Sequence, residues 1–261
     1  MPDIRPAFDD ADAYERYMGR WSRAIGEKFL AWLAPPKGSR WLDIGCGTGA
    51  FSQLIAQHCA PKSLSGIDPS PQQIAFARAK LPQADLRVAD SMALPFEDGG
   101  FDVVASALVL HFIPDRSKAF AEMKRVARRG GTIAAYTWER SVAEDFAPYA
   151  AMLRGFKAIG AEPTRSPTVP EQQLEGLRAS AAAAGLTDVA VTQVEAPQSF
   201  QNFDEYWEVQ TLTVSPIGKA VAKLDEAQRA RLREAMRGLV PVASDGSITY
   251  PARAVAFRAN A

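Results

Sequence analysis

The chain has 261 residues, 47% of them hydrophobic and 23% charged, and its 30 Lys and Arg balance 30 Asp and Glu. This composition is that of a globular protein with enough apolar material for a full core. The balanced charge and the lack of a long basic run argue against a nucleic-acid partner. Residues 1–20 have no apolar core of a signal peptide, and no stretch approaches the roughly 18 apolar residues of a membrane span. We therefore expect a cytoplasmic protein.

The cysteines and histidines do not indicate metal or disulfide chemistry. Cys46 and Cys59 are the two cysteines, and there are two histidines. They form neither a disulfide framework nor a CxxC or HxxxH spacing. The sequence therefore predicts no metal site and no structural disulfide.

In chain order, the first apolar residues recur every three or four positions. This pattern over residues 10–33 predicts one or two helices, which end before Pro35 and Pro36. Strands and helices then alternate, and Ser70 before Pro71 is typical of a helix start. The alternation predicts a doubly wound α/β fold with a parallel sheet covered on both faces. The predicted strands are 40–44, 63–67, 85–89, 101–110 and 131–138, and the predicted helices between them are 50–59, 71–81 and 117–129.

The second half of the chain follows a less regular pattern. It contains predicted helices at 142–159, 171–184, 200–214 and 225–239, and predicted strands at 188–194 and 247–257. We expect one sheet domain with a helical lid. Its segments are an N-terminal lid segment at 1–37, an α/β core at 38–195, a helical insert that caps the substrate at 196–246, and a last core strand at 247–261.

The stretch WLDIGCGTGAF, residues 41–51, runs from a strand through three alternate glycines into a helix. Gly45, Gly47 and Gly49 let the backbone turn tightly beside a ligand, and the helix start offers free N–H groups to an anion. Together with Ala50, the same residues satisfy the GxGxxA fingerprint of dinucleotide sites. The glycines alone therefore leave two classes of cofactor open.

Three acids at the ends of successive strands separate these two classes. The charge of Asp43 would repel a pyrophosphate but would suit the ammonium group of an amino acid. Asp68, about 20 residues beyond the turn, is suited to accept both ribose hydroxyls. Asp90 is suited to accept a hydrogen bond from the exocyclic amine of adenine. Singly each could be a turn acid or a helix-dipole partner, but together they describe a site for S-adenosylmethionine (SAM).

Four motifs, WLDIGCGTGAF, GIDPSPQQIAFARAK, VADSMALPFEDGGFDVV and ALVLHFIPD, resemble those of class I SAM-dependent methyltransferases. The group that includes quinone-pathway and other small-molecule enzymes is the most similar, and the resemblance is strong over residues 38–138. It implies a mostly parallel, seven-stranded Rossmann-like sheet whose last strand is antiparallel. The cofactor-binding residues that it implies are Asp43, Gly45, Gly47 and Gly49 for the methionine part, Asp68 for the ribose, Asp90, Ser91 and Met92 for the adenine, Ala107 and Leu108 as lining, and Tyr17 and Arg23 as closing residues. Cys46, read as a small loop residue, and Pro69 lie in the same cofactor-binding turns.

The reaction that the resemblance implies is in-line SN2 transfer of a methyl group to a small molecule, which leaves S-adenosylhomocysteine. It requires alignment and exclusion of water, and no metal. An oxygen or nitrogen nucleophile must lose a proton, and His111, which follows the fourth strand, is the candidate base. The alternative for His111 is a packed histidine that belongs to the fold.

Aromatic residues predict an acceptor pocket for an aromatic or lipophilic small molecule. Tyr136 and Trp138 end the fifth strand, and Phe203, Tyr206 and Trp207 form one face of a helix in the insert. Such a face is also typical of core packing.

Two further functions stay open: a nicotinamide-dependent oxidoreductase, and a non-catalytic SAM-binding regulator on the same fold. Asp43 and Asp90 argue against the first. The sequence leaves the acceptor, the methylated atom and the oligomeric state undetermined.

Overall fold

A computed structural model of the chain describes residues 15–139, 149–163 and 168–261. The chain divides into two compact units, which we call the sheet unit and the helical unit and describe separately. The sheet unit is Ser22–Ser141, Thr168–Glu195 and Arg253–Ala261, and the helical unit is Met1–Trp21, Val142–Pro167 and Ala196–Ala252.

One seven-stranded sheet has the order β3-β2-β1-β4-β5-β7-β6. Strands β1 to β5 pair in parallel, and β7 pairs antiparallel with β5. This confirms the predicted doubly wound α/β fold. The strand order reverses between β1 and β4, where such sheets bind ligands. The strands are β1 (Arg40–Ile44), β2 (Ser63–Asp68), β3 (Asp85–Val88), β4 (Phe101–Ala107), β5 (Ala127–Trp138), β6 (Thr187–Phe200) and β7 (Ile248–Asn260).

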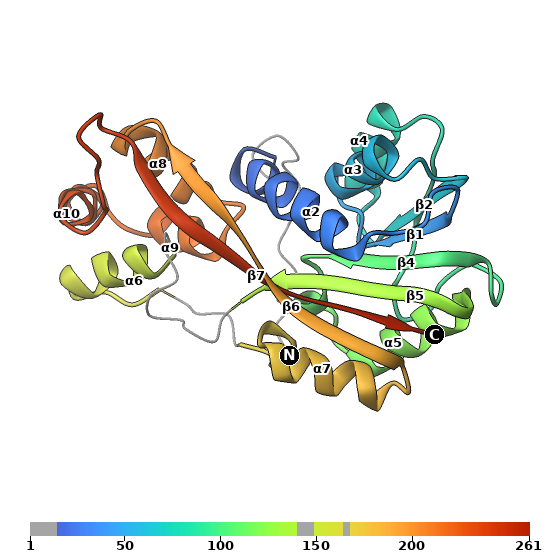
Figure 1. Cartoon of the computed structure of the whole chain (residues 1–261). Helices are drawn as coiled ribbons and strands as arrows, with labels where there is room; N and C mark the ends of the chain where they lie inside the picture. Colours follow the sequence, from blue (N-terminus) through green and yellow to red (C-terminus); the bar gives the residue numbers. More distant parts are fainter. Residues whose placement is uncertain (1–14, 140–148, 164–167) are drawn as a thin grey trace. The chain divides into compact units, whose positions relative to one another are not determined.

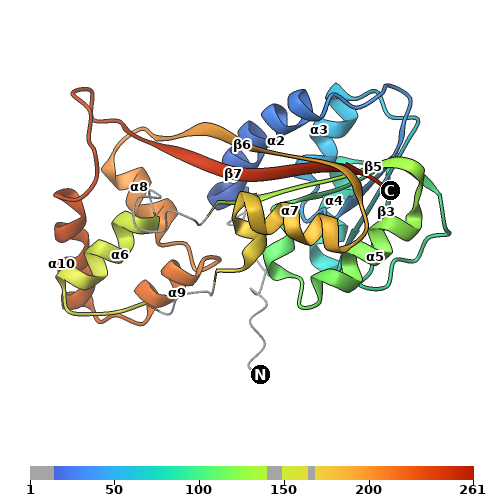
Figure 2. The ribbon, with the colours of Figure 1, turned by 60° about the horizontal axis from the view of Figure 1, so that its bottom comes forward.

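Helices cover both faces of the sheet in the sheet unit. Helices α2, α3 and α4 lie on one face, and α5 and α7 lie on the other (Figures 1 and 2). Their bounds are α2 (Arg20–Leu33), α3 (Ala50–His58), α4 (Pro71–Lys80), α5 (Arg116–Val126) and α7 (Leu174–Ala183). The Ser70 hydroxyl accepts the Gln73 N–H at 3.4 Å, which confirms the predicted cap of α4.

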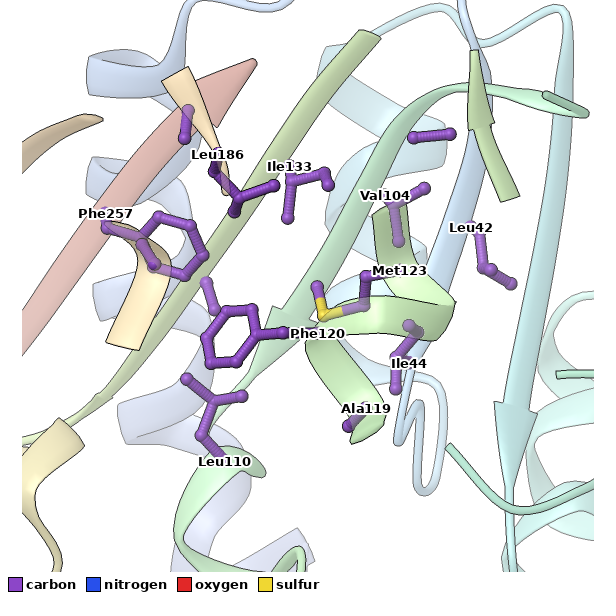
Figure 3. Close-up of a cluster of buried hydrophobic side chains, with 14 of the residues drawn as sticks. Leu42, Ile44, Val104, Leu110, Ala119, Phe120, Met123, Ile133, Leu186 and Phe257 are labelled. Atoms are coloured by element: carbon purple, nitrogen blue, oxygen red, sulfur yellow. The ribbon is translucent and has the colours of Figure 1, made fainter. Parts of the chain in front are cut away.

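The main core lies between the sheet and α5 (Figure 3). Successive strand residues point to opposite faces, so Leu42 and Ile44 join this core while Asp43 faces α3. Phe120 and Phe257, both 1% exposed or less, pack with ring centroids 5.7 Å apart. Each such side chain contributes roughly 1.5–3 kcal/mol on burial, so this core fixes the strand ends that form the site.

The fourth strand is shorter than predicted. It ends at Ala107, because Leu108 adopts the left-handed conformation with φ 61° and turns the chain out of the sheet. A short 3-10 helix, η2 (Leu110–Phe112), follows instead of strand. The predicted helix 117–129 also ends early, since β5 begins at Ala127.

The second half of the chain departs further from the prediction. Strand β6 continues to Phe200, so the first residues of the predicted insert 196–246 are strand. Helix α9 was not predicted, although its Ser215 cap and Pro216 repeat the signal of Ser70 and Pro71. Residues 142–148 of one predicted helix lie outside the described residues. The remaining elements are η1 (Glu15–Gly19), α6 (Tyr149–Ala158), η3 (Pro170–Gln172), α8 (Phe203–Gln210), α9 (Pro216–Ala222) and α10 (Glu226–Arg237).

Candidate cofactor site

The glycine turn connects β1 to α3. The N–H groups of Gly45 and Cys46 both donate to the Ile67 carbonyl, at 2.8 and 2.9 Å, which ties the turn to β2. Gly45, Gly47 and Gly49 all have positive φ values of 71°, 53° and 83°. A Cβ at Gly45 would lie 2.5 Å from Val109 Cγ2, so this position requires glycine for both conformation and space.

Asp43 lies beneath this turn and is fully buried. Its Oδ2 accepts the Ser52 hydroxyl at 2.6 Å, and its Oδ1 has no hydrogen-bond partner among the described residues. Burial, and to a smaller extent the nearby Asp68, raise the pKa of Asp43, the Ser52 hydrogen bond opposes them, and the resulting pKa is about 7. A buried carboxylate with one unpaired oxygen is costly until a cation or donor satisfies it.

Asp68 ends β2 and is fixed by two backbone donors. Gly47 N–H lies 3.1 Å from Oδ2, and Ser70 N–H lies 2.9 Å from Oδ1. Burial raises the pKa of Asp68, and these two hydrogen bonds lower it. Because a carboxylate accepts about four hydrogen bonds, Asp68 retains capacity for two hydroxyl donors.

Asp90 follows β3 and is exposed. Its Oδ1 accepts the Met92 N–H at 2.8 Å, and its carbonyl accepts the Ala93 N–H at 3.1 Å. Ser91 and Met92 are partly buried beside it, and Pro69 is exposed after β2. Asp43, Asp68 and Asp90 thus lie at or just beyond the carboxyl ends of three neighbouring strands, where the sequence analysis expects them.

Cys46 is buried within the turn, and its Sγ would lie 3.1 Å from a Cβ at Gly66. Burial raises the pKa of its thiol well above the ordinary value, which keeps the thiol protonated. This agrees with a small packing residue. Both Cys46 and Cys59 are free thiols.

His111 lies on η2, beyond the end of β4. Its Nδ1 is 3.0 Å from Oγ1 of the fully buried Thr137, which orients the ring. The Phe112 ring, 45% exposed, lies 3.9 Å from the imidazole between ring centroids. Ala107 is partly buried and Leu108 is 6% exposed. The chain therefore leaves the sheet, toward the turn that carries His111, at a buried leucine.

The structure places Tyr136 in the core, which differs from the predicted acceptor pocket. Its side chain is fully buried, and its ring centroid lies 4.8 Å from that of Phe29 and 5.7 Å from that of Phe51. It therefore packs α2 and α3 onto the sheet. Trp138 at the end of β5 is partly buried, as is Arg23 on α2.

The aromatic face of α8 belongs to the helical unit. Tyr206 is fully buried, with its ring centroid 5.2 Å from that of Phe200. Phe203 is 7% exposed and lies beneath the Arg237 guanidinium at 4.4 Å. Phe203 and Tyr206 are thus packed residues rather than an open pocket face, and Trp207 is the member of the set that is partly exposed.

Sequence reasoning missed Ser52 and Thr137, the partners of Asp43 and His111. Ser52 falls in the first turn of α3, where a side chain faces back toward the preceding strand. Thr137 is a polar residue within an apolar strand. In both cases the sequence offered one signal of a functional partner: a single hydroxyl residue within a segment that is otherwise expected to be buried.

Within the part of the chain that the structure covers, none of the helices has the length and apolar character needed to cross a bilayer. The same residues include no group of three or more His, Cys, Asp or Glu side chains placed to hold a metal ion.

Comparison with known proteins relates this site to a family. A methyltransferase-domain family model matches residues 42–135. A demethylmenaquinone methyltransferase of Roseiflexus castenholzii is 40% identical over 110 residues, 40% of this chain and 45% of the relative. A malonyl-[acyl-carrier protein] O-methyltransferase of Methylococcus capsulatus is 30% identical over 160 residues, 59% of this chain and 58% of the relative. The chain thus spans about half the length of these curated relatives.

Solved structures show the same fold at low identity. The YcgJ protein of Bacillus subtilis matches with a TM-score of 0.57 and 16% identity over 90% of this chain and 97% of that one. A Haemonchus contortus phosphoethanolamine N-methyltransferase 2 in complex with SAM matches with a TM-score of 0.55 and 19% identity over 97% of this chain and 56% of that one. The family match thus identifies residues 42–135 as a methyltransferase domain, and the three strand-end acids lie within it.

Proposed function

We propose that the protein is an enzyme that transfers the methyl group of SAM to a small-molecule acceptor and releases S-adenosylhomocysteine. The observation that carries this proposal is Asp43, whose Oδ1 is buried without a partner beneath a turn that leads into a helix start. A ligand with an ammonium group beside a carboxylate satisfies both features at once. A pyrophosphate would accept hydrogen bonds from the helix start but would leave the Asp43 oxygen without a donor.

The residues present fit each part of SAM. Asp43 and the glycine turn would hold the ammonium and carboxylate of the methionine part. The two remaining acceptor positions of Asp68 match the two ribose hydroxyls. Asp90, which is exposed beside the backbone of Ser91 and Met92, would receive the adenine amine.

When bound, SAM supplies an electrophilic methyl group on a sulfonium, so the protein has mainly to align the acceptor and exclude water. For an oxygen or nitrogen acceptor, we assign proton removal to His111, which Thr137 orients through Nδ1. A carbon acceptor with a low pKa would lose its proton with less assistance from a base. For such an acceptor, His111 would serve only as a packed residue of η2.

The acceptor is proposed to have an aromatic or lipophilic body. The curated relatives include a demethylmenaquinone methyltransferase and a 2-methyl-6-phytyl-1,4-hydroquinone methyltransferase, of Synechocystis, which is 37% identical over 108 residues, 40% of this chain and 34% of that relative. Their names support a hydrophobic ring as acceptor. A malonyl-[acyl-carrier protein] O-methyltransferase is also similar, so the methylated atom is left open.

Two measurements test the proposal. Calorimetry with SAM and with NADH should show binding of SAM alone; binding of NADH without SAM would establish the oxidoreductase instead. The protein is then incubated with methyl-labelled SAM and a metabolite extract, and the label should move to an organic product. SAM binding without any labelled product would identify a SAM-binding regulator.

A further inference from the structure

The Asp43 carboxyl is buried among groups of the sheet unit that give it one hydrogen bond. The Ser52 hydroxyl, which is fully buried as well, donates to Oδ2 at 2.6 Å. In the register of the sheet, Asp43 lies between Gly66 of β2 and Ala105 of β4, and neither of these residues has a polar side chain. The Oδ1 atom therefore has no hydrogen-bond partner among the described residues.

The titratable groups near this carboxyl add no positive charge. Asp68 at the end of β2 opposes the ionisation of Asp43. Burial raises the pKa of the Cys46 thiol in the glycine turn well above its ordinary value, so this neighbour stays protonated. The group that α3 contributes, Ser52, is neutral. Among the described residues, no Lys or Arg forms a hydrogen bond or an ion pair with Asp43.

A carboxyl in these surroundings is more stable protonated than charged. An uncompensated charge in a protein interior costs far more free energy than a neutral hydroxyl, and a neighbouring negative charge adds to that cost. The pKa of Asp43 is about 7 for these reasons, although the Ser52 hydrogen bond lowers it. Geometry and charge thus both favour the acid form in the absence of a ligand.

We propose that the ligand-free protein holds a proton on Asp43 and that the ammonium group of the cofactor displaces this proton on binding. The carboxyl O–H bond breaks, the proton passes to the solvent, and Oδ1 accepts an N–H of the ammonium group in its place. The ammonium group supplies both the donor and the positive charge that the surroundings lack. The displacement rests on the proposed function, whereas the bound proton does not.

This proposal makes Ser52 a positioning residue. Its hydroxyl bonds Oδ2, which leaves Oδ1 as the oxygen that can accept from the ammonium group. The same hydrogen bond favours the ionised form of Asp43. Ser52 therefore helps to set the pH range in which cofactor binding displaces the proton, and its loss should move that range upward.

The test measures proton release when S-adenosylhomocysteine, which has the same ammonium group and no methyl group to transfer, binds to the full chain. Titration calorimetry at pH 6 in MES and in bis-Tris, whose ionisation enthalpies differ, gives the number of protons released. With a pKa of about 7, we expect about 0.9 protons for each molecule bound. From pH 5 to pH 6 the affinity should rise about ninefold more in the unaltered protein than in Asp43→Asn.

Three variants assign the proton. Asp43→Asn should bind with no proton release, apart from a contribution of Asp68, whose pKa burial also raises. The affinity of Ser52→Ala should level off at a higher pH than that of the unaltered protein. The matched control is Ser106→Ala, which removes a buried hydroxyl of β4 that has no hydrogen-bond partner among the described residues. Its pH dependence should equal that of the unaltered protein.

Equal proton release by the unaltered protein and Asp43→Asn, or equal pH profiles of Ser52→Ala and Ser106→Ala, would overturn the inference. A second measurement needs no ligand. In protein labelled with ¹³C-aspartate, the carboxyl resonance that Asp43→Asn lacks should shift with a midpoint near pH 7. A resonance of the ionised form throughout pH 5–8 would overturn the inference even in a protein that binds SAM. Failure of SAM and S-adenosylhomocysteine to bind would refute the proposed function, while the resonance would still decide whether Asp43 holds the proton.

Discussion

Replacing Asp43 by Asn tests the buried carboxylate beneath the glycine turn. Asn has nearly the same shape, and its carbonyl can still accept the Ser52 hydroxyl that lies 2.6 Å from Oδ2. What the change removes is the negative charge. It should therefore stabilise the ligand-free fold while weakening SAM binding, two effects of opposite sign from one substitution.

The magnitude follows from the pKa of Asp43, which burial raises from 3.8 to about 7. Between these values the folded protein keeps a proton that the unfolded chain has lost, so stability falls as the pH rises. Above pH 7 the full cost is present, about 4 kcal/mol at about 1.4 kcal/mol per tenfold change. At pH 5 the cost is about 1.6 kcal/mol, and below pH 4 it disappears.

Urea unfolding at pH 5 and pH 8 measures this difference. Asp43→Asn should exceed the unaltered protein in free energy of unfolding by more at pH 8 than at pH 5, with Glu175→Gln, an exposed acid of α7, as the control without effect. SAM affinity of the variant should fall by roughly tenfold to a hundredfold, the value of a hydrogen bond to a charged group. Equal gains at both pH values, or unchanged SAM affinity, would refute this account of Asp43.

Three other changes test the rest of the site. Asp68→Ala should reduce SAM affinity by about tenfold or more with the fold retained, by calorimetry and circular dichroism, because it removes two ribose acceptors; unchanged affinity would remove Asp68 from the ribose. His111→Ala should lower turnover with a lesser effect on SAM affinity, and unaltered turnover would exclude it as the base. Gly45→Ala should destabilise the fold by about 1–3 kcal/mol in thermal unfolding, because its Cβ would meet Val109 at 2.5 Å. Combining it with Val109→Ala should recover part of that loss, and no recovery would place the cost in the backbone alone.

The parallel half of the fold was predictable because each local signal agrees with the sheet. Strand β1 begins and ends where the apolar run 40–44 does, and the Ser70 cap starts α4 as expected. Errors arose where one residue overrides the pattern. Apolar residues continue after Ala107, but the left-handed Leu108 ends β4 there. Helix α9 was not predicted because Gly218 lowers the helix propensity of this short segment. The packing requires a glycine there, since a Cβ would lie 1.9 Å from the Leu212 carbonyl oxygen.

The site was predictable where the fold alone places a residue. Asp43, Asp68 and Asp90 end neighbouring strands, and parallel topology brings such ends to one edge. The prediction for Tyr136 was wrong because a position at the end of a strand does not fix which face of the sheet the side chain takes, and this side chain packs against Phe29. Residues in the helical unit depend on contacts between distant segments, which no local pattern reports.

The left-handed conformation of Leu108 carries a steric cost that its buried side chain offsets. A glycine would adopt φ 61° without the steric penalty of roughly 1–2 kcal/mol that a leucine incurs there. The leucine side chain, 6% exposed, recovers about 1.5–3 kcal/mol by burial. The two amounts nearly cancel, so stability gives little reason to prefer leucine. We propose that the Leu108 side chain instead serves as a wall of the cofactor site, at the point where the chain leaves the sheet.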